Sequence, residues 1–123
     1  MSVHTRSQKL AQSAFARVQD RHEKLSEKEF KDFSGFARKF PALIHTCGLA
    51  QAVAFALAKK ETDYIGDLAA VLEASEHSEI VDGPSLDKHA RTQTLSGYLR
   101  LSRDAINAAS WLKRYVEAVG GEE

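Results

Sequence analysis

The sequence has little of what disulfides, sheets and long loops require. It contains one cysteine, Cys47, two prolines and seven glycines among 123 residues. A single cysteine excludes an internal disulfide and any site built from paired thiolates, which fits a reducing cytoplasm. No segment alternates polar and apolar residues as a half-buried strand does, whereas good helix formers are common. We therefore predict an all-α protein of the cytoplasm, folded as one compact domain of five to six helices over residues 1–123.

Motifs for catalysis and for cofactors are also missing. The five histidines are scattered, and none forms a helical pair with another His or a Glu at the spacing that metal ligands need. The chain has no glycine-rich phosphate loop, no nucleophile elbow and no paired carboxylates on an apolar helix face. We expect no catalytic residue, no metal site and no cofactor, so a binding or scaffold role remains.

Charge is balanced in total but uneven along the chain. Residues 1–60 carry eleven basic residues (Lys and Arg) against five acidic ones (Asp and Glu). Residues 61–90 carry one basic residue against eight acidic ones. The remaining residues, 91–123, carry five basic residues against four acidic ones. A basic region can bind a polyanion, and an acidic region can bind another protein or a second copy of the chain. The competing interpretation is that both regions are solvated helix faces.

The longest stretch without a formal charge is FPALIHTCGLAQAVAFALA, residues 40–58. Its apolar residues go nearly all the way round a helix, so we expect other helices to surround it. It is not a membrane span, because polar residues interrupt it and two lysines follow it. Gly48 should separate two helices, since glycine alone enters the left-handed conformation without steric cost. Pro41 should start or kink the first of them near Phe40.

Capping signals and apolar periodicity divide the chain into helices. Thr5 with Gln8, and Ser26 with Glu29, have the spacing of capping boxes. The pattern Asp82-Gly83-Pro84 is typical of a turn, so residues 75–85 are predicted as a loop. Six helices are expected, near residues 5–25, 27–47, 49–60, 62–75, 85–92 and 96–119.

Two aspects of helix patterning bear on what the protein binds. Four phenylalanines recur at helical spacing in the second helix, and we predict a buried aromatic seam rather than exposed base-stacking rings. The first helix carries an apolar face that includes Phe15. It also carries a separate basic stripe with no acidic residue before Asp20, formed by Arg6, Lys9, Ser13, Arg17 and Lys24. Such a stripe lacks the i,i+4 ion pairs of an ordinary solvated helix, which favours phosphate binding. The last helix bears a second arginine stripe opposite its apolar face, formed by Arg100, Arg103, Asn107 and Arg114.

Three stretches of the chain form a recognisable pattern. They are Thr5-Arg6-Ser7-Gln8 with Ala11, Ala14 and Val18; Lys39-Phe40-Pro41-Ala42-Leu43-Ile44 with Gly48-Leu49-Ala50-Gln51-Ala52; and Arg103-Asp104-Ala105 with Trp111-Leu112-Lys113-Arg114. The central stretch is the most specific, because Phe-Pro is followed by Gly-Leu-Ala-Gln within one apolar run. Together the three stretches resemble the small subunit of the type III-B CRISPR effector, the Cmr complex. The resemblance covers nearly the whole chain, in order and at the right spacing.

The resemblance implies a non-catalytic helical subunit of an RNA-guided, RNA-targeting complex in antiviral defence. Several copies of that subunit stack into an inner filament, beside a second filament of backbone subunits that carry the guide RNA. The partners it implies are those backbone subunits, neighbouring copies of this chain, and the backbone of the guide and target RNA. The family provides no catalytic motif to transfer, so candidate residues rest on helix faces.

The basic stripes and the acidic region supply these candidates. Asp63 and Asp67 are expected at a protein interface with a neighbouring subunit, where a head-to-tail contact that does not close would produce a stack. The alternatives are a stand-alone helical protein-interaction module without nucleic acid, and the small subunit of the related type III-A complex. The residues expected to face RNA are Arg6, Lys9, Arg17, Arg38, Lys39, Arg103 and Arg114.

Overall fold

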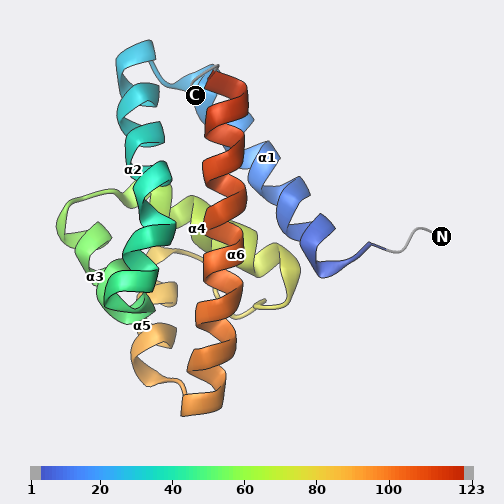
Figure 1. The fold of residues 1–123 in the computed structure, drawn as a ribbon, viewed down its shortest axis with the longest axis vertical. Coiled ribbons are helices and arrows are strands. Elements are labelled where there is room, and N and C mark those ends of the chain that lie inside the picture. The colour runs from blue at the N-terminus through green and yellow to red at the C-terminus, as the bar shows by residue number, and fades with distance from the viewer. Residues whose placement is uncertain (1–3, 121–123) are drawn as a thin grey trace.

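The computed structural model describes residues 4–120 and shows a bundle of α-helices, with no strand in that part of the chain (Figure 1). This confirms the predicted all-α class. The helices are α1 (Arg6–Lys24), α2 (Glu27–Cys47), α3 (Leu49–Ala58), α4 (Thr62–Ser75), α5 (Gly83–Thr92) and α6 (Leu95–Gly120).

Both predicted capping boxes are confirmed. The Gln8 amide donates to Thr5 Oγ1 at 3.0 Å, and the Thr5 amide donates to Gln8 Oε1 at 2.8 Å. Ser26 and Glu29 exchange the same two bonds at 2.9 and 3.1 Å, and the bond from the Ser26 backbone lowers the pKa of Glu29. Each box satisfies amides that the first helical turn leaves without a partner. The starts of α1 and α2 are therefore fixed by local sequence.

The fifth helix begins two residues earlier than predicted. Asp82 is its N-cap, and its carboxylate accepts a bond from the Ser85 amide at 2.8 Å. Pro84 lies in the first turn, where proline costs no hydrogen bond because that turn has no intrahelical acceptor for its amide. The turn signals of this segment are thus the beginning of a helix, and the loop between α4 and α5 is correspondingly shorter.

Gly48 joins α2 to α3 as the sequence predicts. It has a φ of 84°, and a Cβ there would lie 3.3 Å from the Tyr98 hydroxyl of α6. That hydroxyl accepts a bond from the Ala50 amide at 3.1 Å, so α6 caps the start of α3. Pro41 does not start a helix, because α2 continues through it from Glu27.

The last helix holds the bundle together. α6 packs against α1, α2 and α4 and runs the length of the molecule (Figure 1). Small side chains allow these close approaches, since Ala105, Ala108 and Ala109 on α6 are fully buried.

The predicted aromatic seam of α2 is confirmed. Phe30, Phe33 and Phe40 are buried, and Phe36 is half-buried. The seam packs around Tyr64 of α4, whose ring centroid lies 5.1 Å from that of Phe40. These rings form core structure between α2 and α4 rather than a base-stacking surface.

The central stretch is less enclosed than expected. α3 is only ten residues long and packs on one side, so its outer face exposes Ala54, Phe55 and Ala58. Phe55 is 43% exposed, with the Lys59 ammonium 5.6 Å from its ring centroid. Phe15 was also expected on the buried face of its helix, yet it too is 43% exposed. Both predictions were wrong because helical periodicity gives the direction of a side chain but not the width of the neighbouring helix that covers it.

Candidate nucleic-acid interface

Part of the basic stripe on α1 faces α4. Arg17 donates to Asp67 Oδ1 through Nε at 2.9 Å and through Nη2 at 2.7 Å. Arg21 donates to Asp67 Oδ2 through Nε at 2.9 Å, and this bond raises the pKa of Arg21. Asp67 itself is fully buried. One predicted RNA contact, Arg17, and one predicted interface residue, Asp67, are therefore bound to each other inside the chain.

Two other arginines, one from each basic stripe, meet near a second buried carboxylate. Arg6 of α1 pairs with Glu76 at 2.8 Å and lies 3.6 Å from Asp104 Oδ1. Arg103 of α6 lies 3.7 Å from the same oxygen. The other carboxylate oxygen of Asp104 is 2.8 Å from Nε2 of His77. The structure thus brings Arg6 and Arg103 together, although they are far apart in sequence.

A groove of about 710 Å³ separates the first turns of α1 from the middle of α6. Arg6 and Glu76 line one side, and Asn107, Ser110, Trp111 and Arg114 of α6 line the other. Arg114 is exposed and forms no ion pair within residues 4–120. Guanidinium groups bind phosphate oxygens in fork geometry, and indole rings stack on bases. This groove therefore combines a side chain that can bind a phosphate with one that can stack on a planar ring.

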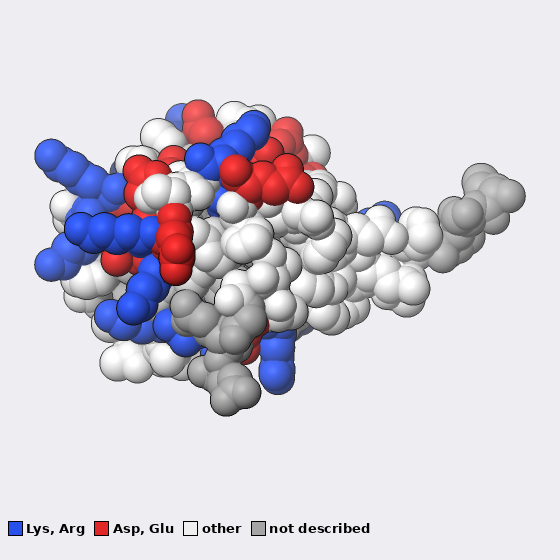
Figure 2. All heavy atoms as spheres, turned by 90° about the horizontal axis from the view of Figure 1, so that it is seen from above, with Lys and Arg blue, Asp and Glu red and all other residues white. Residues whose placement is uncertain are grey.

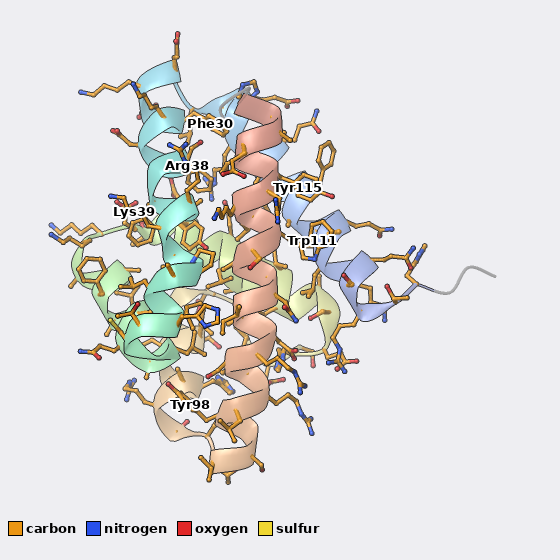
Figure 3. The ribbon with its side chains drawn as sticks, in the orientation of Figure 1. Phe30, Arg38, Lys39, Tyr98, Trp111 and Tyr115 are labelled. Atoms are coloured by element: carbon orange, nitrogen blue, oxygen red, sulfur yellow. The ribbon has the colours of Figure 1, made fainter. Side chains whose placement is uncertain are left out.

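The remaining candidates lie elsewhere. Lys9 is exposed on α1, and Asp63 is exposed at the start of α4, 3.6 Å from Arg21. Figure 3 places Arg38 on the side of α2 that faces α6 and Lys39 on the outer side. Lys39 lines a different, largely apolar groove between α2 and α3. The seven basic candidates consequently do not share one face.

The charged side chains are also mixed in space. Figure 2 shows Lys and Arg projecting from the side of α2 and α3, with Asp and Glu beside them. The opposite side, toward the start of α1, is mostly uncharged in that view. The charge blocks of the sequence do not produce a uniformly basic face in this view, because the fold packs α1 against acidic α4.

Aromatic residues beside the α1–α6 groove were missed as functional candidates. Trp111 and Tyr115 are one helical turn apart, and Figure 3 shows both on the side of α6 that faces α1. Their i,i+4 spacing was the available signal. Nothing in the sequence indicates that they lie close to Phe15 of α1, because that proximity depends on how α1 packs on α6.

Residues 4–120 contain neither a metal-ligand cluster nor a membrane span. No three side chains of His, Cys, Asp or Glu in this range gather closely enough to hold a metal ion. No helix in the same range is both long and apolar enough to cross a membrane.

Comparisons with known proteins point to one family. A family model described as "CRISPR-associated protein (Cas_Cmr5)" matches residues 6–119. A Thermus thermophilus protein described as "CRISPR system Cmr subunit Cmr5" is 35% identical over 120 residues, which cover 95% of this chain and 97% of that protein.

A solved structure agrees with the sequence comparisons. The X-ray crystal structure of a CRISPR-associated Cmr5 family protein from Thermus thermophilus superposes with a TM-score of 0.81 at 36% identity. The match covers 94% of this chain and 97% of the other. The agreement of sequence and fold over nearly the full length shows that this chain belongs to the Cas_Cmr5 family of CRISPR-associated proteins.

Proposed function

We propose that this chain is a non-catalytic small subunit of a type III-B CRISPR Cmr complex, that its copies stack into a filament, and that they line the guide–target RNA. The observation that carries the proposal is the nearly full-length match to a relative described as a Cmr subunit. Its partners are the other subunits of the complex and neighbouring copies of itself.

The RNA-facing role rests on exposed cations of α1 and α6. Lys9, Arg103 and Arg114 are exposed, and Arg6 lines the side of the groove opposite Arg114. These side chains contact phosphates and carry no sequence information, because base pairing with the guide supplies it. Arg17 and Arg38 contribute less, since Arg17 is bound to a buried carboxylate and Arg38 is half-buried. Lys39, on the far side of α2, would require a second RNA-facing surface.

Stacking requires a surface for a neighbouring subunit, and the start of α6 provides one. Leu95 is 76% exposed and Leu99 is 59% exposed. They are four residues apart, so they lie on the same face of the helix. Figure 1 shows this end of α6 at one extremity of the molecule, far from the C-terminus. Contact of this end with a different surface of the next copy is heterologous, which allows an open stack.

Replacing Lys9, Arg103 and Arg114 with alanine together is expected to weaken RNA binding by the assembled complex and to reduce its salt dependence. Each lost phosphate contact lowers the slope of log K against log salt by about 0.7 to 0.9 per subunit. Filter binding at several salt concentrations measures this slope. The matched control replaces Lys28, Lys31 and Arg91, which are exposed on α2 and α5. This control removes the same amount of positive charge. Equal slopes for the two triple variants would remove the α1 and α6 cations from the RNA-facing set.

Replacing Leu95 and Leu99 with aspartate is expected to weaken stacking at least about tenfold, because burial of one exposed leucine contributes about 1.5 kcal/mol or more. The chain should fold normally, since both side chains are exposed. Native mass spectrometry of the reconstituted complex counts the subunit copies. Val81→Asp is the control, at another exposed apolar residue. A full number of copies with the double variant would place the interface elsewhere.

Asp63→Lys tests the acidic candidate separately. Failure of the native chain to co-purify with Cmr subunits would contradict the proposed function itself.

A further inference from the structure

Three aromatic rings form a ladder across α1 and α6. The centroids of Phe15 and Tyr115 lie 5.3 Å apart with the rings at 74°, an edge-to-face contact. The centroids of Tyr115 and Trp111 lie 5.7 Å apart with the rings at 19°, a stacked contact. Phe15 is 43% exposed, and the two α6 rings are half-buried. The ladder thus begins at solvent and ends at Trp111.

Trp111 is the ladder residue that also lines the α1–α6 groove. Tyr115 stacks against its indole and Phe15 supports Tyr115, so the ring is held from behind while it borders an open space. A rigid, partly exposed indole beside a groove is a stacking surface for another planar ring.

The polar side chains of the groove select the ring that fits. Arg114 is one turn beyond Ser110 and offers an unpaired guanidinium among the described residues. Asn107 and Ser110 supply donors and acceptors suited to a base edge or a ribose hydroxyl. Glu76 also lines the groove, but its carboxylate is bound to Arg6 at 2.8 Å. A ligand that joins an aromatic ring to a negatively charged group is therefore favoured, and a nucleotide has both, in its base and its phosphate.

We propose that Trp111 stacks on an unpaired base of single-stranded RNA whose adjoining phosphate binds Arg114. The base must be unpaired because a base inside a duplex has no free face to offer. Phe15 and Tyr115 are positioning residues that hold the indole. This site rests on the proposed RNA-facing role and deepens it, since it adds contact with a base to contacts with phosphates.

Trp111 makes the proposal directly measurable, because it is the one tryptophan in the sequence. Its emission in the isolated chain reports on the groove alone. The native chain is titrated at low salt with single-stranded oligoadenylate, and separately with an oligomer of the same length that has the sugar–phosphate backbone but no bases. We expect quenching that saturates with oligoadenylate and no comparable quenching with the abasic oligomer. This comparison requires no variant, so it does not depend on how a variant folds.

Variants then test the residues. Trp111→Leu is expected to bind dye-labelled oligoadenylate about tenfold more weakly, the typical loss for one stacked base. Phe15→Ala keeps the tryptophan and is expected to reduce the quenching. Phe55→Ala is the matched control, because Phe55 has the same 43% exposure but lies on α3. Its binding and quenching should equal those of the native chain.

Three results would overturn the stacking site. Equal quenching by both oligomers would mean that phosphate alone is bound. Absence of quenching up to about 1 mM oligonucleotide, well above the usual range of non-specific dissociation constants, would mean that no base reaches Trp111. Quenching by other Cmr subunits without RNA would identify the groove as a protein contact. The proposed function is judged separately, by the salt slope and copy number of the assembled complex.

Discussion

Replacing Tyr64 with alanine is expected to lower the free energy of unfolding by about 4 kcal/mol, as for other large core aromatics. The ring is fully buried at the centre of the aromatic seam, with centroids 6.0, 5.4 and 5.1 Å from those of Phe33, Phe36 and Phe40. Alanine would leave a cavity between α2 and α4 and remove three ring contacts. Urea denaturation measures the loss as a lower midpoint with an unchanged slope.

Tyr64→Phe is the informative control. The Tyr64 hydroxyl is buried and has no hydrogen-bond partner among residues 4–120, and burial raises the pKa of Tyr64 well above its usual value. Removing an unpaired buried hydroxyl eliminates a desolvation cost. The variant should therefore equal the native chain in free energy of unfolding or exceed it by up to about 1 kcal/mol. Equal instability of the alanine and phenylalanine variants would contradict a role based on ring packing.

Replacing Asp67 with alanine is expected to lower the free energy of unfolding by about 3 kcal/mol, the lower end for removing one partner of a buried ion pair. The lower end applies because the arginine side chains are partly exposed, at 40% for Arg17 and 20% for Arg21, and can be hydrated once the carboxylate is gone. The main effect is loss of the contact between α1 and α4. Thermal unfolding followed by circular dichroism measures it, with a drop in Tm of roughly 10 °C.

Asp63→Ala provides the comparison for Asp67. Asp63 is one turn earlier on the same helix, but its side chain is 58% exposed and lies 3.6 Å from Arg21. Its removal should change stability by less than about 1 kcal/mol, since exposed pairs contribute little. Equal losses for the two variants would show that burial of Asp67 is unimportant. The same contacts explain why Arg17→Ala is a poor test of RNA binding, because it would loosen the fold as well.

The sequence was a good guide wherever a few neighbouring residues determine the structure. Thr5 with Gln8 and Ser26 with Glu29 identified two helix starts, and Gly48 identified a junction, because each signal acts within one turn. The helical spacing of the phenylalanines identified the buried seam.

Contacts between distant segments were not predictable in the same way. Arg17 and Asp67 are 50 residues apart, and nothing local indicates that the basic stripe of α1 faces the acidic helix α4. The exposure of Phe15 and Phe55 likewise depends on which helices pack beside them. The α1–α6 groove could not be predicted for the same reason, although Arg6 and Arg114 are both among the predicted RNA contacts.

The position of α6 also has a consequence for biosynthesis. α1 and α2 both pack on α6, yet α6 leaves the ribosome only after α1 to α5 have emerged. Until residues 95–120 emerge, the apolar faces of α1 and α2 lack their largest partner, so the core closes only once α6 has been made. A premature stop before α6 therefore yields an unfolded, aggregation-prone chain rather than a smaller working subunit.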